Sequence, residues 1–460
     1  MLMAKRTSMP GLRLAEAPGP ATGQLRRVLG FWDLVLLVIG TVIGSGIFLV
    51  PGAVLRPVGN SVPLALAAWL TGGVLSLLGA LTYGELSAMK PQAGGLYIYI
   101  RDCFGPFPAF LFGWTLFFVL SAGSVATLAV AFGAYFSEFV RLTPWMVKSL
   151  SALMIAVIAV VNVRGTRGSA DLQNAMTAIK IFAIVLMASA LLWLGKSFAT
   201  GNAAPPGFGP GAYASGFGMA MISVLWAYEG WQYATFSAGE AINPQRNFPL
   251  AFLVGSATLI AIYLFANFGY LAALGPAGVS RSNRVAASAV SLVIGPVAAK
   301  LVALTILVSI FSAANSIMLT APRVYYAMAR DGVFFNRLAE IHPRYGTPAF
   351  AVIALASWAA ILAATGTFEQ LLTYVIFIGW IFYALAAASL FVYRKRDPEA
   401  KRPYRVPGYP VTPSLFILAA AALVLNTIVA QPARAALGIG IVLLGAPAYL
   451  IWRRRTQYAL

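Results

Sequence analysis

The sequence predicts an all-α integral membrane protein with twelve transmembrane helices. Three observations support this fold class: 60% of the 460 residues are apolar, only 10% are charged, and the apolar residues fall into stretches of about twenty. A bilayer core of about 30 Å needs roughly 20 residues per helical crossing, so twelve helices would use about 240 residues. A water-soluble globular fold is therefore excluded.

Turn residues and charged clusters separate the apolar stretches. The twelve helices are expected at residues 31–55, 63–88, 106–137, 145–163, 171–194, 215–239, 248–274, 295–329, 348–365, 369–393, 412–430 and 434–452. The segments between these helices are too short for a water-soluble domain. Residues 1–30 contain five basic residues among Pro, Gly and Ala, and we expect them to form a mobile cytoplasmic tail.

The distribution of Lys and Arg predicts the orientation in the membrane. Segments on the side of the N-terminus hold 23 of the 32 basic residues, and those on the other side hold eight. Because the anionic cytoplasmic leaflet and the insertion machinery retain positive charge, we expect both termini in the cytoplasm and the chain in the cell's inner (plasma) membrane. Membrane lipids therefore explain the net charge of +19 better than a nucleic-acid partner does.

Neither a metal nor another cofactor is expected. The chain has one His (His342) and one Cys (Cys103), too few for a soft-metal site, and no disulfide can form within the chain. A membrane-embedded enzyme is disfavoured for the same reason, because no metal set, Cys pair or cluster of acids supplies a catalytic constellation. An ion channel would need a continuous polar lining, which the helical faces do not show.

Glycines interrupt the first predicted helix at Gly40, Gly44 and Gly46. Each Gly weakens a helix by roughly 1 kcal/mol relative to Ala. One interpretation is a small-residue face, since Gly40 and Gly44 have the GxxxG spacing that lets two helices approach closely. The other is a broken helix whose second half directs free N–H groups and a positive dipole end at an anionic ligand. The spacing alone favours neither interpretation.

Two charged groups are predicted deep inside the membrane. Glu229 lies about fourteen residues into the sixth predicted helix, where an acid marks a substrate site or gate unless it only hydrogen-bonds to a neighbouring helix. Lys180 lies about 13 Å along the fifth helix, too deep for easy snorkelling, so its ammonium replaces a coupling cation or forms a fixed internal strut. Glu240 and Arg246, just after the sixth helix, are expected to serve cytoplasmic-side structure and gating.

Several motifs resemble those of the amino acid-polyamine-organocation (APC) transporters. The motifs are Gly44–Phe48 in the first helix, Tyr83–Leu86 with Pro91–Tyr97 after the second, and Gly239–Asn247 after the sixth. Within that superfamily, Trp226–Tyr228 with Gly230–Trp231, together with Ala178–Lys180, are most similar to the L-type amino acid transporter branch.

The resemblance implies a leucine-transporter-like fold, in which two inverted repeats of five helices are followed by two appended helices. Similar offsets relate the Gly-Pro pairs at 105–106 and 295–296, and relate Ser45 to Glu229, as such a repeat would leave behind. The expected divisions are a tail at 1–30, repeats at 31–195 and 196–393, and a basic loop with two helices at 394–460.

In the family fold, the substrate lies where the first and sixth helices unwind. The resemblance implies that backbone N–H groups hold the carboxylate of an amino acid and carbonyl groups accept from its ammonium. The N–H groups belong to Ser45, Gly46 and Ile47, next to Gly44, and the carbonyls lie near Val42, Ile43, Trp226, Ala227 and Glu229. Trp226 matches an outer gate over the substrate. Lys180 matches a lysine near the sodium position of sodium-coupled relatives, with Ser312 or Ser316 as neighbours.

The predicted function is an amino acid permease that works by alternating access, either as a sodium-independent exchanger or by proton-coupled uptake. Glu229 stands where the best-known animal members have Gly, so the alternative is a polyamine or cationic amino acid carrier. Those members also join a glycoprotein subunit through an external Cys, whereas Cys103 is expected in a cytoplasmic loop. No disulfide-linked subunit is therefore expected.

Overall fold

The computed structural model describes residues 25–197, 210–365, 368–430 and 432–457. In these ranges the structure is helical, and the only strand-like pairing is an isolated bridge between Leu29 and Ala241. The first half contains α1 (Phe31–Val42), α2 (Gly46–Leu49), α3 (Pro51–Leu55), α4 (Val62–Met89), α5 (Leu96–Phe104), α6 (Pro106–Thr115), η1 (Leu116–Ser121), α7 (Ala122–Phe136), α8 (Pro144–Arg164) and α9 (Thr166–Leu194). The second half contains α10 (Pro210–Ala227), η2 (Trp231–Glu240), α11 (Pro244–Arg281), α12 (Val285–Val293), α13 (Pro296–Thr320), α14 (Pro322–Arg330), η3 (Asn336–Ala339), α15 (Ala349–Thr365), α16 (Phe368–Arg396), α17 (Val411–Ala430), α18 (Pro432–Leu443) and α19 (Gly445–Gln457).

Eight segments of the described chain are long and apolar enough to cross a membrane. They cover residues 62–89, 106–136, 144–164, 166–194, 244–281, 296–330, 411–429 and 435–452, and each overlaps one predicted helix. The predicted ninth helix is the shorter apolar helix α15, and the tenth is α16. An all-helical fold with several membrane-spanning segments is therefore observed.

The helix boundaries differ from the prediction in several places, and the first, sixth and eighth predicted helices are divided. The first predicted helix is divided into α1, α2 and α3, and the sixth into α10 and η2. The eighth is divided at Pro322, which lacks the N–H group that would continue the helical hydrogen bonds. The short helices α5 and α12 were not predicted because neither is long enough to span a bilayer, and Cys103 belongs to α5 rather than to a loop.

The predicted tail is ordered from Leu25 onward, while residues 1–24 lie outside the described residues. The N–H groups of Val28 and Leu29 donate to the carbonyl oxygen of Glu240 at 2.9 and 3.0 Å, and the N–H group of Ile242 donates to Leu29 at 2.8 Å. Residues 28 and 29 are therefore fixed to the end of η2.

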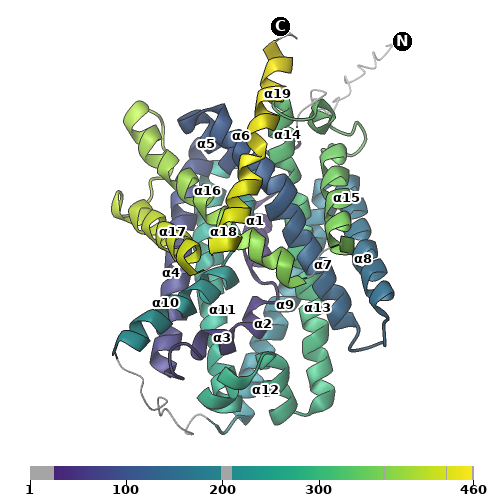
Figure 1. The fold of residues 1–460 in the computed structure, drawn as a ribbon, viewed down its shortest axis with the longest axis vertical. Coiled ribbons are helices and arrows are strands. Elements are labelled where there is room, and N and C mark those ends of the chain that lie inside the picture. Colours follow the sequence, from purple (N-terminus) through teal and green to yellow (C-terminus); the bar gives the residue numbers. More distant parts are fainter. Residues whose placement is uncertain (1–24, 198–209, 366–367, 431, 458–460) are drawn as a thin grey trace, which may run out of the picture.

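The helix α1 lies inside the bundle, where it packs against α9, α11 and α13 (Figure 1). The two ends of the described chain lie at the same end of the molecule. Arg26 is next to Gly346, and Trp452 of α19 packs on Phe334 and Phe335, which belong to the same connecting region as Gly346. In Figure 1 this end carries α5, α14 and α19, and α12 lies at the opposite end.

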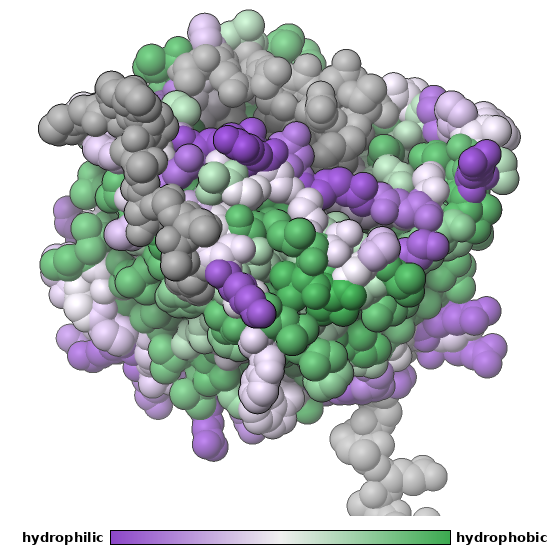
Figure 2. Space-filling view, turned by 90° about the horizontal axis from the view of Figure 1, so that it is seen from below, coloured by the Kyte–Doolittle hydropathy of each residue, from purple (hydrophilic) through white to green (hydrophobic). Residues whose placement is uncertain are grey.

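The outer surface is rich in apolar side chains. Trp193, Val429 and Val297 are 87%, 81% and 78% exposed. Figure 2, which views the molecule from the end opposite α19, shows apolar residues over much of the visible surface, interrupted by polar groups. Exposed apolar side chains also lie along the spanning segments, such as Leu153 of α8, Phe182 of α9 and Leu418 of α17, which indicates contact with lipid rather than water.

Candidate functional site

The first predicted helix is interrupted where its glycines cluster. The helix α1 ends at Val42, α2 begins at Gly46, and Ile43 between them is extended with a ψ of 90°. Gly40, inside α1, lies so close to α9 that a Cβ atom there would be 2.1 Å from Nε2 of Gln173. Both interpretations of the glycines therefore apply, because Gly40 permits a close helix contact and the residues after it form a break.

A second break lies in the sixth predicted helix. The helix α10 ends at Ala227, and Gly230 in the following turn has a φ of 128°, which side-chain-bearing residues rarely adopt. A Cβ atom on Gly230 would lie 2.8 Å from the carbonyl oxygen of Thr41, so the two breaks touch. The hydroxyl group of Tyr263 on α11 donates to the carbonyl oxygens of Ala227 (3.0 Å) and Val42 (3.3 Å), which ties the breaks together.

A cavity lies beside the two breaks, with about 110 Å³ accessible to the centre of a water molecule. Seven lining residues were predicted from the sequence, namely Val42, Gly44, Ser45, Gly46, Trp226, Ala227 and Glu229. The other lining residues are Thr41, Ser124, Thr127, Leu128, Gly230, Tyr233, Ala313 and Ile317. The predicted residues Ile43 and Ile47 do not line the cavity and are fully buried.

The backbone around the cavity has opposite polarity on its two sides. The first N–H groups of α2 have no preceding helical turn to accept them. The last carbonyl groups of α1 and α10 have no following turn, and the donors they do have are single groups, such as the Tyr263 hydroxyl for Val42 and Ala227 and the Glu229 N–H group for Trp226. Free N–H groups favour anions and free carbonyl oxygens favour cations. The cavity can therefore hold a small molecule with both charges, such as a zwitterion.

The ammonium group of Lys180 supports the first break. Its Nζ atom donates to the carbonyl oxygens of Gly40 (2.6 Å) and Ile43 (2.7 Å), and the side chain is fully buried. Ser312 and Ser316 are engaged elsewhere, because Ser312 accepts from the Gln173 amide and the Ser316 hydroxyl donates to the Ser312 carbonyl oxygen. The positive charge thus lies against carbonyl oxygens at the end of α1, the environment that either a cation substitute or a strut requires.

Glu229, at the second break, is one of the residues that line the cavity. The hydroxyl group of Tyr383 on α16 donates to its Oε1 atom at 2.9 Å. Among the described residues, no Lys or Arg forms an ion pair with this carboxyl group. An intramembrane acid without a cationic partner needs a proton, water or a bound cation, so Glu229 is available to a ligand.

Glu240 lies in a fully buried ion pair at the end of η2. Arg323 donates to its two carboxylate oxygens at 2.6 and 2.9 Å, and Thr166 at the start of α9 donates to Oε1 at 2.7 Å. Arg246, the other residue expected to serve gating, is exposed, and the ion-pair partner of Glu240 is Arg323. Because the backbone of Glu240 also holds Val28 and Leu29, this residue joins four segments of the chain.

Comparison with known proteins decides the family. Residues 29–447 match the family model described as amino acid permease. The chain belongs to the amino acid permease family. The permease is 32% identical over 436 residues to the serine/threonine exchanger SteT of Bacillus subtilis (strain 168), covering 94% of this chain and 98% of that protein. It is 31% identical over 458 residues to the cystine/glutamate transporter of Homo sapiens, covering 98% and 90%. It is 33% identical over 421 residues to the b(0,+)-type amino acid transporter 1 of Homo sapiens, covering 91% and 86%.

These matches confirm the predicted resemblance to the APC superfamily and its L-type branch. The permease is a multi-pass membrane transporter and not an enzyme, because its family and these relatives are transporters and exchangers. Cys103, the single cysteine, is free and 5% exposed.

Three residues of the permease that surround the breaks were not predicted. Tyr263 and Tyr383 come from α11 and α16, and a tyrosine in an apolar helix gives no signal that distinguishes a site from an interface. Arg323 had a usable signal, because it falls inside the predicted eighth helix, where an arginine requires a partner.

Proposed function

We propose that this permease exchanges amino acids across the plasma membrane by alternating access. The observation that carries the proposal is the pair of touching helix breaks beside one cavity, in a chain of this family. The cavity of about 110 Å³ has room for a small molecule such as an amino acid.

In the proposed architecture, twelve spans form two inverted repeats of five helices and an appended pair. The eight spans above are joined by the two broken segments, α1–α3 and α10–η2, and by α15 and α16. Both termini are placed in the cytoplasm, which agrees with the position of Arg26 and Trp452 at one end of the molecule and with the predominance of basic residues expected on that side. Because Cys103 is buried, no disulfide-linked subunit is included in the proposal.

The substrate carboxylate is proposed to bind the N–H groups of Ser45, Gly46 and Ile47, next to Gly44. Its ammonium is proposed to bind the carbonyl oxygens of Val42, Trp226 and Ala227 and the region of Glu229. These carbonyl oxygens also accept within the protein, so the ammonium would share them with existing donors. Ile43 accepts from Lys180, Ala227 from Tyr263, Trp226 from Glu229, and Val42 from Gly44 and Tyr263. Trp226, which lines the cavity and lies against Gly46, is proposed as the outer gate.

The inner gate is proposed at Glu240, where η2, α9, α14 and the N-terminal segment meet. Opening toward the cytoplasm would have to separate at least one of these segments. Lys180 is proposed to remain charged and to replace a coupling cation, which favours sodium-independent exchange. Proton-coupled uptake is the alternative, in which Lys180 or Glu229 changes protonation during the cycle.

The proposal is tested with purified permease in liposomes loaded with one amino acid and offered a labelled one. Exchange of at least one of the twenty amino acids is expected. Gly46→Val should abolish this exchange. A Cβ atom at position 46 would lie 3.3 Å from Ala227, and the rest of the branched side chain would fill the space next to the amides. Gly218→Val is the matched control, since a Cβ atom there meets open space. Wild-type exchange by Gly46→Val would remove the assigned carboxylate site.

A second candidate is a carrier of cationic amino acids or polyamines, which the unpaired carboxyl group of Glu229 favours. Competition for uptake by leucine, alanine, serine, arginine and putrescine separates the two. Strong inhibition by arginine or putrescine, with weak inhibition by the neutral amino acids, would select the cationic carrier. The opposite order would select the neutral exchanger.

A further inference from the structure

One phenylalanine of the first appended helix reaches the wall behind the cavity. Phe416 on α17 is fully buried, and its ring centroid lies 5.8 Å from that of Trp231, 6.2 Å from Tyr83 and 5.9 Å from Trp380. These three rings belong to η2, α4 and α16. A single side chain of α17 therefore contacts three separate elements of the transporter core.

The core contains a notch that fits this ring. A Cβ atom on Gly79 of α4 would lie 2.5 Å from Cε2 of Phe416 and 2.8 Å from Cη2 of Trp231. Real Cβ atoms do not approach other atoms this closely, so any larger residue at position 79 would displace one of these rings. The packing of Phe416 against Trp231 is consequently tight and leaves little freedom for either ring.

Two sets of contacts connect these aromatic rings to residues at the cavity. Trp231 begins η2 directly after Gly230, so its position sets where the second break ends. The hydroxyl group of Tyr83 donates to the carbonyl oxygen of Tyr383 at 2.8 Å, and the hydroxyl group of Tyr383 donates to Glu229 at 2.9 Å. The rings around Phe416 thus hold both the backbone next to Glu229 and the donor to its carboxyl group.

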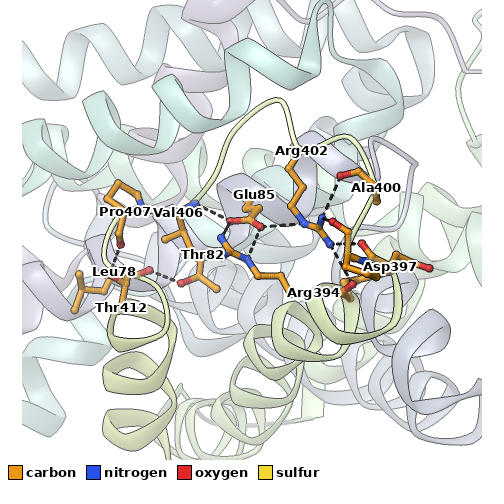
Figure 3. A network of polar contacts seen from close by, with 12 residues as sticks. Leu78, Thr82, Glu85, Arg394, Asp397, Ala400, Arg402, Val406, Pro407 and Thr412 are labelled. Carbon is orange, nitrogen blue, oxygen red and sulfur yellow. Dashed lines mark hydrogen bonds and ion pairs between the residues drawn. The ribbon is translucent and has the colours of Figure 1, made fainter.

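A polar network fixes the beginning of α17 to the end of α4 (Figure 3). Glu85 is fully buried and accepts from Nε (3.0 Å) and Nη2 (2.7 Å) of Arg394 and from the N–H group of Val406 (2.6 Å). Nε of Arg402 is 3.7 Å from the same carboxylate. The hydroxyl group of Thr412 donates to the carbonyl oxygen of Pro407 at 2.5 Å. We call residues 394–412 the strap; it connects α16 to α17 and is held by Glu85.

We propose that α17 positions the wall of the binding cavity, with Phe416 as a positioning residue for Trp231 and Glu229 and with the strap as its anchor. The role assigned to the cavity rests on the proposed function, whereas the effect on the order of η2 does not. A bound substrate does not touch Phe416 in this arrangement, because Phe416 does not line the cavity. Its loss should therefore weaken substrate binding through the position of the wall and leave the translocation machinery assembled.

The test compares Phe416→Ala with Leu418→Ala, a control on the lipid-facing side of the same helix, where Leu418 is 64% exposed. In liposomes, Phe416→Ala should raise KM by about fivefold or more while kcat changes less than about twofold. Phe416→Leu, which restores most of the volume, should recover most of the wild-type KM. Leu418→Ala should leave both KM and kcat at their wild-type values.

A second measurement does not depend on transport. Hydrogen–deuterium exchange of the permease in detergent should show faster uptake in residues 226–236 for Phe416→Ala, a smaller increase for Phe416→Leu, and none for Leu418→Ala. Should wild-type permease exchange no amino acid, the proposed function fails while this measurement still decides the positioning role. Unchanged uptake in residues 226–236, or an equal increase for Leu418→Ala, would overturn the proposal.

Discussion

Replacing Glu240 with Gln should destabilise the permease more than any surface substitution nearby. Glu240 and Arg323 are both fully buried, and two hydrogen bonds of 2.6 and 2.9 Å join them. Glu240→Gln keeps the shape but removes the charge, which leaves the Arg323 guanidinium without a carboxylate partner among the described residues. Removing one partner of a buried ion pair costs about 3–5 kcal/mol, because the remaining charge stays out of water.

This cost converts into a measurable change of Tm. At about 2.1 cal/mol/K per residue, unfolding of a chain of this length has an entropy near 1 kcal/mol/K, so Tm should fall by roughly 3–5 °C. Thermal unfolding of the permease in detergent, followed by tryptophan fluorescence, measures the difference. Arg246→Gln is the matched control, since this exposed residue does not pair with Glu240, and it should change stability by less than about 0.5 kcal/mol.

The double variant Glu240→Gln with Arg323→Met gives the sharper comparison. Each single substitution leaves one uncompensated buried charge, whereas the double substitution leaves none, so the two losses should not add. We expect the double variant to be at least as stable as Glu240→Gln alone. If the losses are additive, or if Glu240→Gln has the Tm of wild type, the ion pair does not hold these segments together and the reasoning is refuted.

Two further predictions concern the contact between α1 and α9. Gly40→Ala should reduce stability by about 1–3 kcal/mol and slow amino acid exchange, because the added Cβ atom would overlap with the side chains of Gln173 and Thr177. A variant with the Tm and the exchange rate of wild type would contradict this prediction. Lys180→Ala should lower the exchange rate at least about tenfold, because two buried carbonyl oxygens lose their donor at about 1–3 kcal/mol each. Proton flux is measured together with amino acid uptake in both proteins. A stoichiometric proton flux in wild type that is absent in Lys180→Ala would contradict the pure exchanger.

Long apolar helices were located well from the sequence, since length and hydropathy are properties of the chain itself. The first break was left open by the residues, because glycines at 40, 44 and 46 fit a close helix contact as well as an interruption. The residues of the sixth predicted helix indicated a buried acid, Glu229, and not an interruption. Only the family resemblance implied that both helices unwind.

Pairings between distant residues were not predictable in the same way. Arg323 is 83 residues from Glu240, and Tyr383 is 154 residues from Glu229. Many buried tyrosines and several basic residues could serve as partners, and only the packed fold selects among them. Arg246 is much nearer to Glu240 in sequence, but the turn into α11 leaves its side chain exposed. Short helices such as α12 were not predicted because a stretch of nine residues is too short to cross a bilayer.

The helix α9 shows how one face connects the two regions on which the proposals depend. Thr166, Ser169, Gln173, Thr177 and Lys180 recur at intervals of three and four, lie on one face and are buried. The first donates to Glu240, and the last donates to the end of α1, about 21 Å away along the axis at 1.5 Å per residue. A helix with this length of regular hydrogen bonding behaves as a rod. Any movement of the first break relative to the Glu240–Arg323 pair must therefore break hydrogen bonds at one end of α9 or carry the whole helix with it.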